Sequence, residues 1–178
     1  MIKNRLEALS DGVFAIVMTL LAIELKPFHI EGVSELLSFS PHLFLFVLSF
    51  ITIAIFWVNH HHLFHALQNV SHRVLWINIS ALLFVTLVPF ATALLGENRH
   101  SDLALAFYAV IMLGASFCFY ALRKLIHIAE QRVVLRSLVG PICYGLALIS
   151  AFVYQPLAYL FIAVPLVYYI VPAQHSSK

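Results

Sequence analysis

The residues that could do chemistry lie inside or beside long apolar stretches. Ser10 and Asp11 begin the stretch SDGVFAIVMTLLAIEL, and the segment FWVNHHHLFH carries an indole, an amide and four imidazoles. An ionisable side chain in such a place is costly unless it is paired, which makes Asp11 a candidate functional residue. Two interpretations of Asp11 stay open. It caps its helix in the headgroup region, or it joins a polar network with other segments.

Candidate partners for Asp11 stand at the end of one apolar stretch and at the start of the next. They are Trp57, Asn59 and the histidines in the first, and Trp76 and Asn78 in the second. A carboxylate, a hydroxyl, an indole, an amide and an imidazole at one depth can satisfy each other's hydrogen bonds. Such a network would hold the first helix against the second and third.

The histidine cluster His60–His65 also permits a metal or haem site. His61 and His65 are one helical turn apart, a spacing common for two metal ligands. His72 and His127, at the ends of other predicted helices, could supply ligands for a bis-histidine haem. The alternative is that the imidazoles lie at the headgroup boundary or bond within the bundle, and on this alternative we predict neither a metal nor a cofactor.

Enzymatic motifs are missing from the sequence. There is no nucleophile–base pair, no paired carboxylates and no glycine loop that could cradle phosphate. Ser10 and Asp11 near histidines could suggest hydrolysis, but a packing network explains them more simply. We therefore predict that the protein is not an enzyme.

The composition identifies the solvent that surrounds these residues. Hydrophobic residues make up 62% of the 178-residue chain and charged residues 10%, whereas soluble domains are about 45–50% apolar and about 25% charged. A soluble fold of this size could not bury so much apolar surface, which predicts an integral membrane protein. The net charge of +2 comes from sparse basic residues, so no nucleic-acid partner is expected.

Continuous apolar runs predict an all-α bundle of six membrane-spanning helices, since a span needs about 20 apolar residues. We expect one membrane domain over residues 1–178 and no internal repeat. The predicted spans are about 8–26, 41–67 beginning at Pro41, 74–96, 102–128, 136–154 and 156–172.

The distribution of Lys and Arg predicts the orientation of this bundle. Six spans place both termini and the second and fourth loops on one side, which carries Lys3, Arg5, Arg73, Arg123, Lys124, Arg132, Arg136 and Lys178. The other side carries Lys26 and Arg99. Both termini are therefore predicted to be cytoplasmic, in the inner (plasma) membrane of the cell.

The first predicted helix has a stripe that differs from its polar beginning. At 100° per residue, Gly12, Ile16, Thr19 and Ile23 fall within a sector about 60° wide, with Leu20 on its margin. Ser10 and Asp11 point away from this stripe. The stripe has no obvious partner within the chain, which favours a symmetric oligomer in which copies of the stripe meet on the axis.

The pattern Arg5-x-x-x-Leu9-Ser10-Asp11-Gly12, followed by FAIVMTLLAIEL, resembles the signature helix of the prokaryotic relatives of the endolysosomal potassium channel. That family is marked by an Arg-x-x-x-Phe-Ser-Asp motif. The segments FWVNHHHLF and LWINISALLFVTLVPFATALLG are similar to its second and third helices. The resemblance covers roughly the first 100 residues. Leu9 departs from it, because the family has phenylalanine there.

The resemblance implies a potassium-selective cation channel formed by four six-helix subunits in the lipid bilayer. Its first helices would line a pore without a carbonyl filter, and potassium would be the permeant ion. Carried over by position, Ile16, Leu20 and Ile23 would form apolar constrictions, with Thr19 between them. The supporting structural network would comprise Arg5, Ser10, Asp11, Trp57, Asn59, one of His60 and His61, and Asn78.

A secondary ion transporter or proton antiporter is the main alternative. Transporters commonly contain paired repeats and helices broken near the middle of the membrane. Here the predicted spans are unbroken apart from prolines such as Pro89 and Pro165, and no charged residue is expected at the midplane. These features favour a pore over a carrier.

Overall fold

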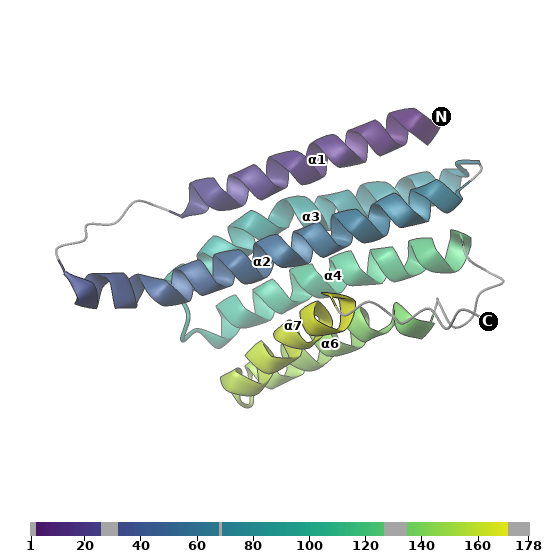
Figure 1. Cartoon of the computed structure of the whole chain (residues 1–178). Helices are drawn as coiled ribbons and strands as arrows, with labels where there is room; N and C mark the ends of the chain where they lie inside the picture. Colours follow the sequence, from purple (N-terminus) through teal and green to yellow (C-terminus); the bar gives the residue numbers. More distant parts are fainter. Residues whose placement is uncertain (1–2, 26–31, 68, 127–134, 171–178) are drawn as a thin grey trace, which may run out of the picture.

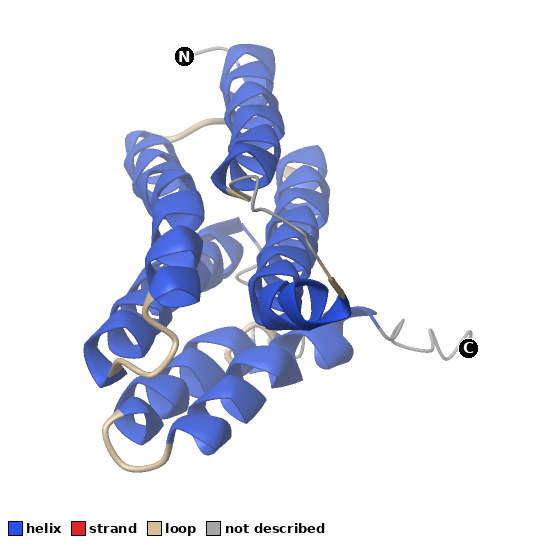
Figure 2. Cartoon of the chain, turned by 90° about the vertical axis from the view of Figure 1, so that its left-hand side faces the viewer, coloured by secondary structure: helices blue, strands red, loops and turns tan. Residues whose placement is uncertain are grey.

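The computed structural model describes residues 3–25, 32–67, 69–126 and 135–170, apart from the side chains at 34–36 and 38. Within these residues the chain forms six helices and no strand (Figures 1 and 2). The helices are α1 (Lys3–Glu24), α2 (Val33–Ala66), α3 (His72–Glu97), α4 (Asp102–Ile126), α6 (Val139–Ala151) and α7 (Gln155–Ile170). The predicted all-α class is confirmed.

The second predicted span, about 41–67 beginning at Pro41, lies close to the apolar stretch Phe39–Ala66 that is long enough to cross a membrane. The helix itself is longer than this span. In the structure α2 begins at Val33 and continues through Pro41. Pro89 and Pro165 likewise lie inside α3 and α7. Proline is tolerated in membrane helices where neighbouring groups satisfy the backbone carbonyl that it frees.

The fifth predicted span, about 136–154, is longer than α6. Four helices, α1 to α4, are long and apolar enough to cross a membrane. In contrast, α6 has 13 residues and α7 has 16. The prediction for the fifth span was too long because Leu138, Phe152 and Val153, which flank α6, are as apolar as the helix itself. The ends predicted for the fourth and sixth spans, at 128 and 172, lie outside the described residues.

Local signals in the sequence set where α3 and α4 begin. The hydroxyl of Ser71 accepts a hydrogen bond from the backbone N–H of Val74 over 3.3 Å, and that of Ser101 accepts one from Ala104 over 3.3 Å. Serine satisfies exposed N–H groups at a helix start in this way. Arg123 and Lys124 occupy the last turn of α4, where positive charge suits the helix dipole.

The helices are arranged so that α1 lies on one side of the bundle and α6 and α7 lie on the other (Figure 1). The first helix packs against α2 and α3, while α4 lies between α3 and α6. Small buried residues such as Ala81, Ala91, Ala109 and Ala115 let α3 and α4 approach closely. One face of α1 is therefore free of contacts from the rest of the described chain.

Candidate functional site

The stripe predicted on α1 is exposed in the single subunit. Ile16 is 59% exposed, Leu20 40% and Ile23 71%, and Gly12 and Thr19 are exposed as well. The buried face of α1 lies roughly opposite and consists of Leu6, Ser10, Phe14, Val17 and Leu21. Apolar side chains, with Thr19 among them, thus face away from the core in the second half of α1.

The hydroxyl of Thr19 is engaged with its own helix. It donates a hydrogen bond to the backbone carbonyl of Ile16 over 2.7 Å, a common arrangement for threonine inside a helix. The bond uses the hydroxyl hydrogen, but the lone pairs of Oγ1 stay available as acceptors. Thr19 can therefore present an oxygen to a cation while it keeps this bond.

Three predicted network residues form a buried chain of hydrogen bonds across α1, α2 and α3. The side-chain amide of Asn78 donates to Ser10 Oγ over 3.1 Å, and Ser10 donates to the carbonyl of Leu6 over 2.9 Å. The Nε2 atom of His60 lies 2.9 Å from Asn78 Oδ1. All three side chains are almost completely buried. Of the two candidate histidines, His60 is therefore the one that joins Ser10 and Asn78.

Asp11 makes a separate contact beside this chain. The indole Nε1 of Trp57 donates a hydrogen bond to Asp11 Oδ1 over 3.0 Å. Both side chains are exposed in the single subunit. His61 lies next to Trp57, with 6.4 Å between ring centroids. This hydrogen bond links α1 to α2. On α1, Asp11 lies between the buried face and the exposed stripe.

Two other residues of the predicted network lie apart from it. Asn59 precedes His60 by one position, so its side chain turns by about 100° toward α4, where its Oδ1 accepts a hydrogen bond from Arg123 over 2.9 Å. Arg5 is exposed, and among the described residues no hydrogen bond or ion pair is found for it. Leu9, the departure from the family motif, is 49% exposed.

The histidines of the metal or haem alternative are dispersed. His61 and His65 are exposed, and His72 accepts a hydrogen bond from the Trp76 indole over 3.0 Å. His127 lies outside the described residues. In the part of the chain that the structure describes, no group of three or more His, Cys, Asp or Glu is placed to hold a metal ion.

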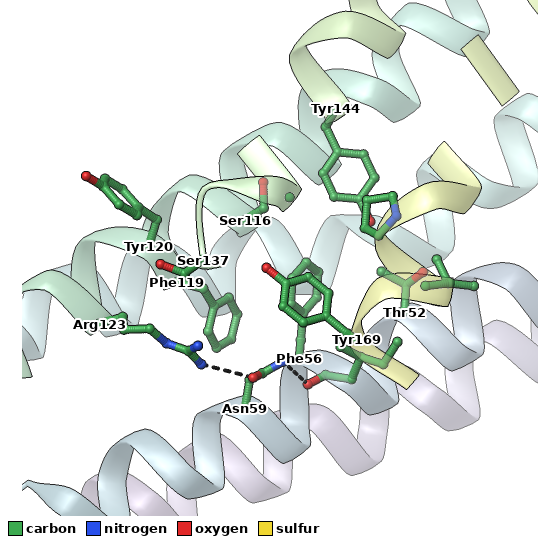
Figure 3. Close-up of a pocket in the computed structure, with 14 residues that line it drawn as sticks. Thr52, Phe56, Asn59, Ser116, Phe119, Tyr120, Arg123, Ser137, Tyr144 and Tyr169 are labelled. Carbon is green, nitrogen blue, oxygen red and sulfur yellow. Dashed lines mark hydrogen bonds between the residues drawn. The ribbon is translucent and has the colours of Figure 1, made fainter. Parts of the chain in front are cut away.

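Sequence reasoning missed two polar sites between the helices. Ser49 Oγ lies 3.0 Å from the Tyr108 hydroxyl and 2.8 Å from Thr92 Oγ1, and these side chains are buried between α2, α3 and α4. The second site is a cavity around Arg123, bounded by α2, α4, α6 and α7 (Figure 3). From the sequence, Arg123 contributes only to the predicted orientation of the bundle. A single polar residue in an apolar stretch does not reveal which helix it faces.

Known proteins share both the sequence and the fold. A family model described as the endosomal/lysosomal potassium channel TMEM175 matches residues 5–89. A protein of Streptomyces collinus named as a potassium channel is 34% identical over 173 residues, which cover 84% of each chain. The chain belongs to the TMEM175 family. Its members are ion channels and multi-pass membrane proteins, so the predicted family and membrane class are confirmed.

The fold of this TMEM175 family member matches a solved structure. A crystal structure described as a lysosomal potassium-selective channel TMEM175 homologue from Chamaesiphon minutus has a TM-score of 0.84 and 36% sequence identity, covering 94% of this chain and 96% of that one. A chicken protein named as an endosomal/lysosomal proton channel is 31% identical over 136 residues, but the match covers only 27% of its length. The likeness to the vertebrate protein is therefore confined to a minor part of it.

Proposed function

We propose that this protein is a potassium channel whose pore is lined by the exposed stripe of α1. The stripe of Gly12, Ile16, Thr19, Leu20 and Ile23 is the observation that carries the proposal, together with membership of the family. This helix buries one side on α2 and α3 and leaves the other free to face lipid or a neighbouring subunit, and family membership favours the neighbouring subunit. Four subunits around one axis would bring the four stripes together, in the closed cyclic symmetry common among oligomers.

Apolar rings in such a pore would both gate it and bias it toward potassium. Rings of Ile16, Leu20 and Ile23 can close a pore by dewetting. They offer no oxygen ligand, so an ion passes them partly hydrated. Removing hydration costs more for sodium than for potassium, because sodium is the smaller ion. The outward lone pairs of Thr19 would replace part of the hydration that potassium loses.

The hydrogen-bonded chain of Ser10, Asn78 and His60, with the Asp11–Trp57 pair, would set the position of α1. We propose that these contacts are structural and hold the pore helix against α2 and α3. The chain 1–178 would act as one membrane unit in the inner membrane, with both termini cytoplasmic as the Lys and Arg distribution favours. We propose no cofactor, enzymatic activity or nucleic-acid partner.

The test is a planar-bilayer recording of the purified protein with potassium on one side and sodium on the other. Unitary currents whose reversal potential favours potassium are the expected result. Flux that saturates at low ion concentration without unitary currents would indicate the transporter alternative. A reversal potential that follows an imposed pH gradient and ignores potassium would indicate a proton pathway, and the potassium proposal would fail.

A further inference from the structure

A partly open cavity of about 30 Å³ lies between α2, α4, α6 and α7, apart from the α1 stripe (Figure 3). Its lining combines aromatic and aliphatic walls with a few polar groups. The polar groups that matter here are Thr52, Asn59, Ser116, Arg123 and Tyr169. The cavity is far smaller than the pockets of about 300 Å³ or more that hold organic ligands, so its occupant can only be of the size of an ion or a water.

Arg123 brings a permanent positive charge to this cavity. Its Nη2 donates a hydrogen bond to Asn59 Oδ1 over 2.9 Å. The side-chain NH₂ group of Asn59 in turn donates to the backbone carbonyl of Ile55 over 2.9 Å. A guanidinium has five N–H donors in a fixed fork, so a single amide oxygen uses only part of its capacity. Neither Asp nor Glu occurs among the described residues that line the cavity.

The hydroxyls around Arg123 do not offset this charge. Thr52 donates to the carbonyl of Leu48 over 2.8 Å, Ser116 to Leu113 over 3.0 Å and Tyr169 to Arg136 over 3.4 Å. These hydroxyls keep lone pairs that can accept from a guanidinium, but neutral lone pairs carry no net charge to set against that of Arg123. A charge held among apolar walls is strongly destabilising unless an opposite charge accompanies it.

We propose that this cavity binds one small monovalent inorganic anion, a halide such as chloride, at the guanidinium of Arg123. About 30 Å³ is room for an occupant of the size of one or two water molecules, because a cavity needs about 10–15 Å³ to hold one water. A halide is close to a water molecule in size, whereas a phosphate or carboxylate group is larger. The low local dielectric strengthens the attraction between the anion and Arg123.

The first experiment places a heavy halide in the unaltered protein. Crystals of the full-length protein grown with potassium bromide should show an anomalous bromide peak within hydrogen-bond distance of the Arg123 guanidinium. A map with no peak there would overturn the proposal. This measurement needs no variant and no ion current, so it stands or fails separately from the potassium-channel proposal.

The second experiment measures binding in solution. Thermal unfolding of the detergent-solubilised protein is followed as chloride replaces gluconate at constant potassium concentration. The midpoint should rise saturably with chloride in the wild type and in Lys124→Gln, which neutralises the exposed neighbouring cation, but not in Arg123→Gln. A bromide peak without a saturable rise would mean binding at crystal concentration only, and would contradict the proposal.

A third measurement asks whether the chain supplies its own anion. Glu130 lies outside the described residues and is the acidic residue nearest to Arg123 in the sequence. The chloride response should be unchanged in Glu130→Gln. If instead the wild type shows no chloride response and Glu130→Gln acquires one, a carboxylate of the protein normally occupies the site, and the halide proposal is wrong for the native protein.

Discussion

The side-chain amide of Asn78 donates a hydrogen bond to the hydroxyl of Ser10 across the contact between α3 and α1, over 3.1 Å. The carbonyl oxygen of the same amide faces His60 Nε2 at 2.9 Å. Because an amide oxygen only accepts, His60 must carry its proton on Nε2 to make this bond. One buried side chain of α3 therefore links α1 and α2 at the polar end of α1.

Asn78→Ala should destabilise the protein by about 1–3 kcal/mol, the cost of leaving buried polar partners unsatisfied. Ser10 loses its donor and His60 loses its acceptor at the same time. Thermal or chemical unfolding in detergent would measure the change. Ser80→Ala is the matched control, since Ser80 lies on the same helix and donates its hydrogen bond to the backbone carbonyl of Trp76 in that helix. Equal stability of the two variants would contradict a structural role for Asn78.

Asp11 and Trp57 should be energetically coupled, because their side chains share a hydrogen bond of 3.0 Å. In a double-mutant cycle, Asp11→Ala and Trp57→Phe should be non-additive. Asp11→Ala and Asn59→Ala should be additive, since Asn59 faces Arg123 instead. Assembly and unfolding of each variant are the measurements. Additivity in both cycles would mean that Asp11 only caps its helix.

Thr19→Val should reduce the preference for potassium over sodium while it preserves the shape of the side chain. A tenfold change in permeability ratio corresponds to about 1.4 kcal/mol, within the range of one hydroxyl per subunit. The readout is the reversal potential under bi-ionic conditions. An unchanged reversal potential would show that the bond from Thr19 to Ile16 is its whole role and that the aliphatic rings set selectivity.

Ile23→Asn should raise the unitary conductance, because an amide would hydrate the apolar ring that we propose at Ile23. Single-channel recording at symmetrical potassium measures the effect. Ile149→Asn is a suitable control, since Ile149 is exposed to a similar extent on α6, 66% against 71%. A conductance equal to that of the control would argue that Ile23 does not line the conducting path.

The assembly around α1 can be tested by cross-linking. In a background where the buried Cys118 and Cys143 are replaced by Ala, Ile23→Cys should cross-link copies of the chain efficiently, and Ile149→Cys should not. A mass of four subunits in detergent is the companion measurement. A stable monomer that still conducts ions would contradict the tetramer.

Much of the fold could be read from the sequence, because apolar runs bounded by serine caps determine where helices form in lipid. The α1 stripe was also accessible, since a regular helix relates Ile16 to Ile23 by simple rotation. The same rule separated Ser10 from the stripe. These are properties of single helices, and no knowledge of their neighbours is needed to infer them.

The contacts between helices were decided only by the tertiary structure. Which histidine meets Asn78 and whether Asn59 faces α1 or α4 depend on the rotation of α2 against its neighbours. That rotation is set by the packing of many side chains at once. Arg123 illustrates the same limit: its charge is evident in the sequence, but the cavity it enters exists only once α2, α4, α6 and α7 are brought together.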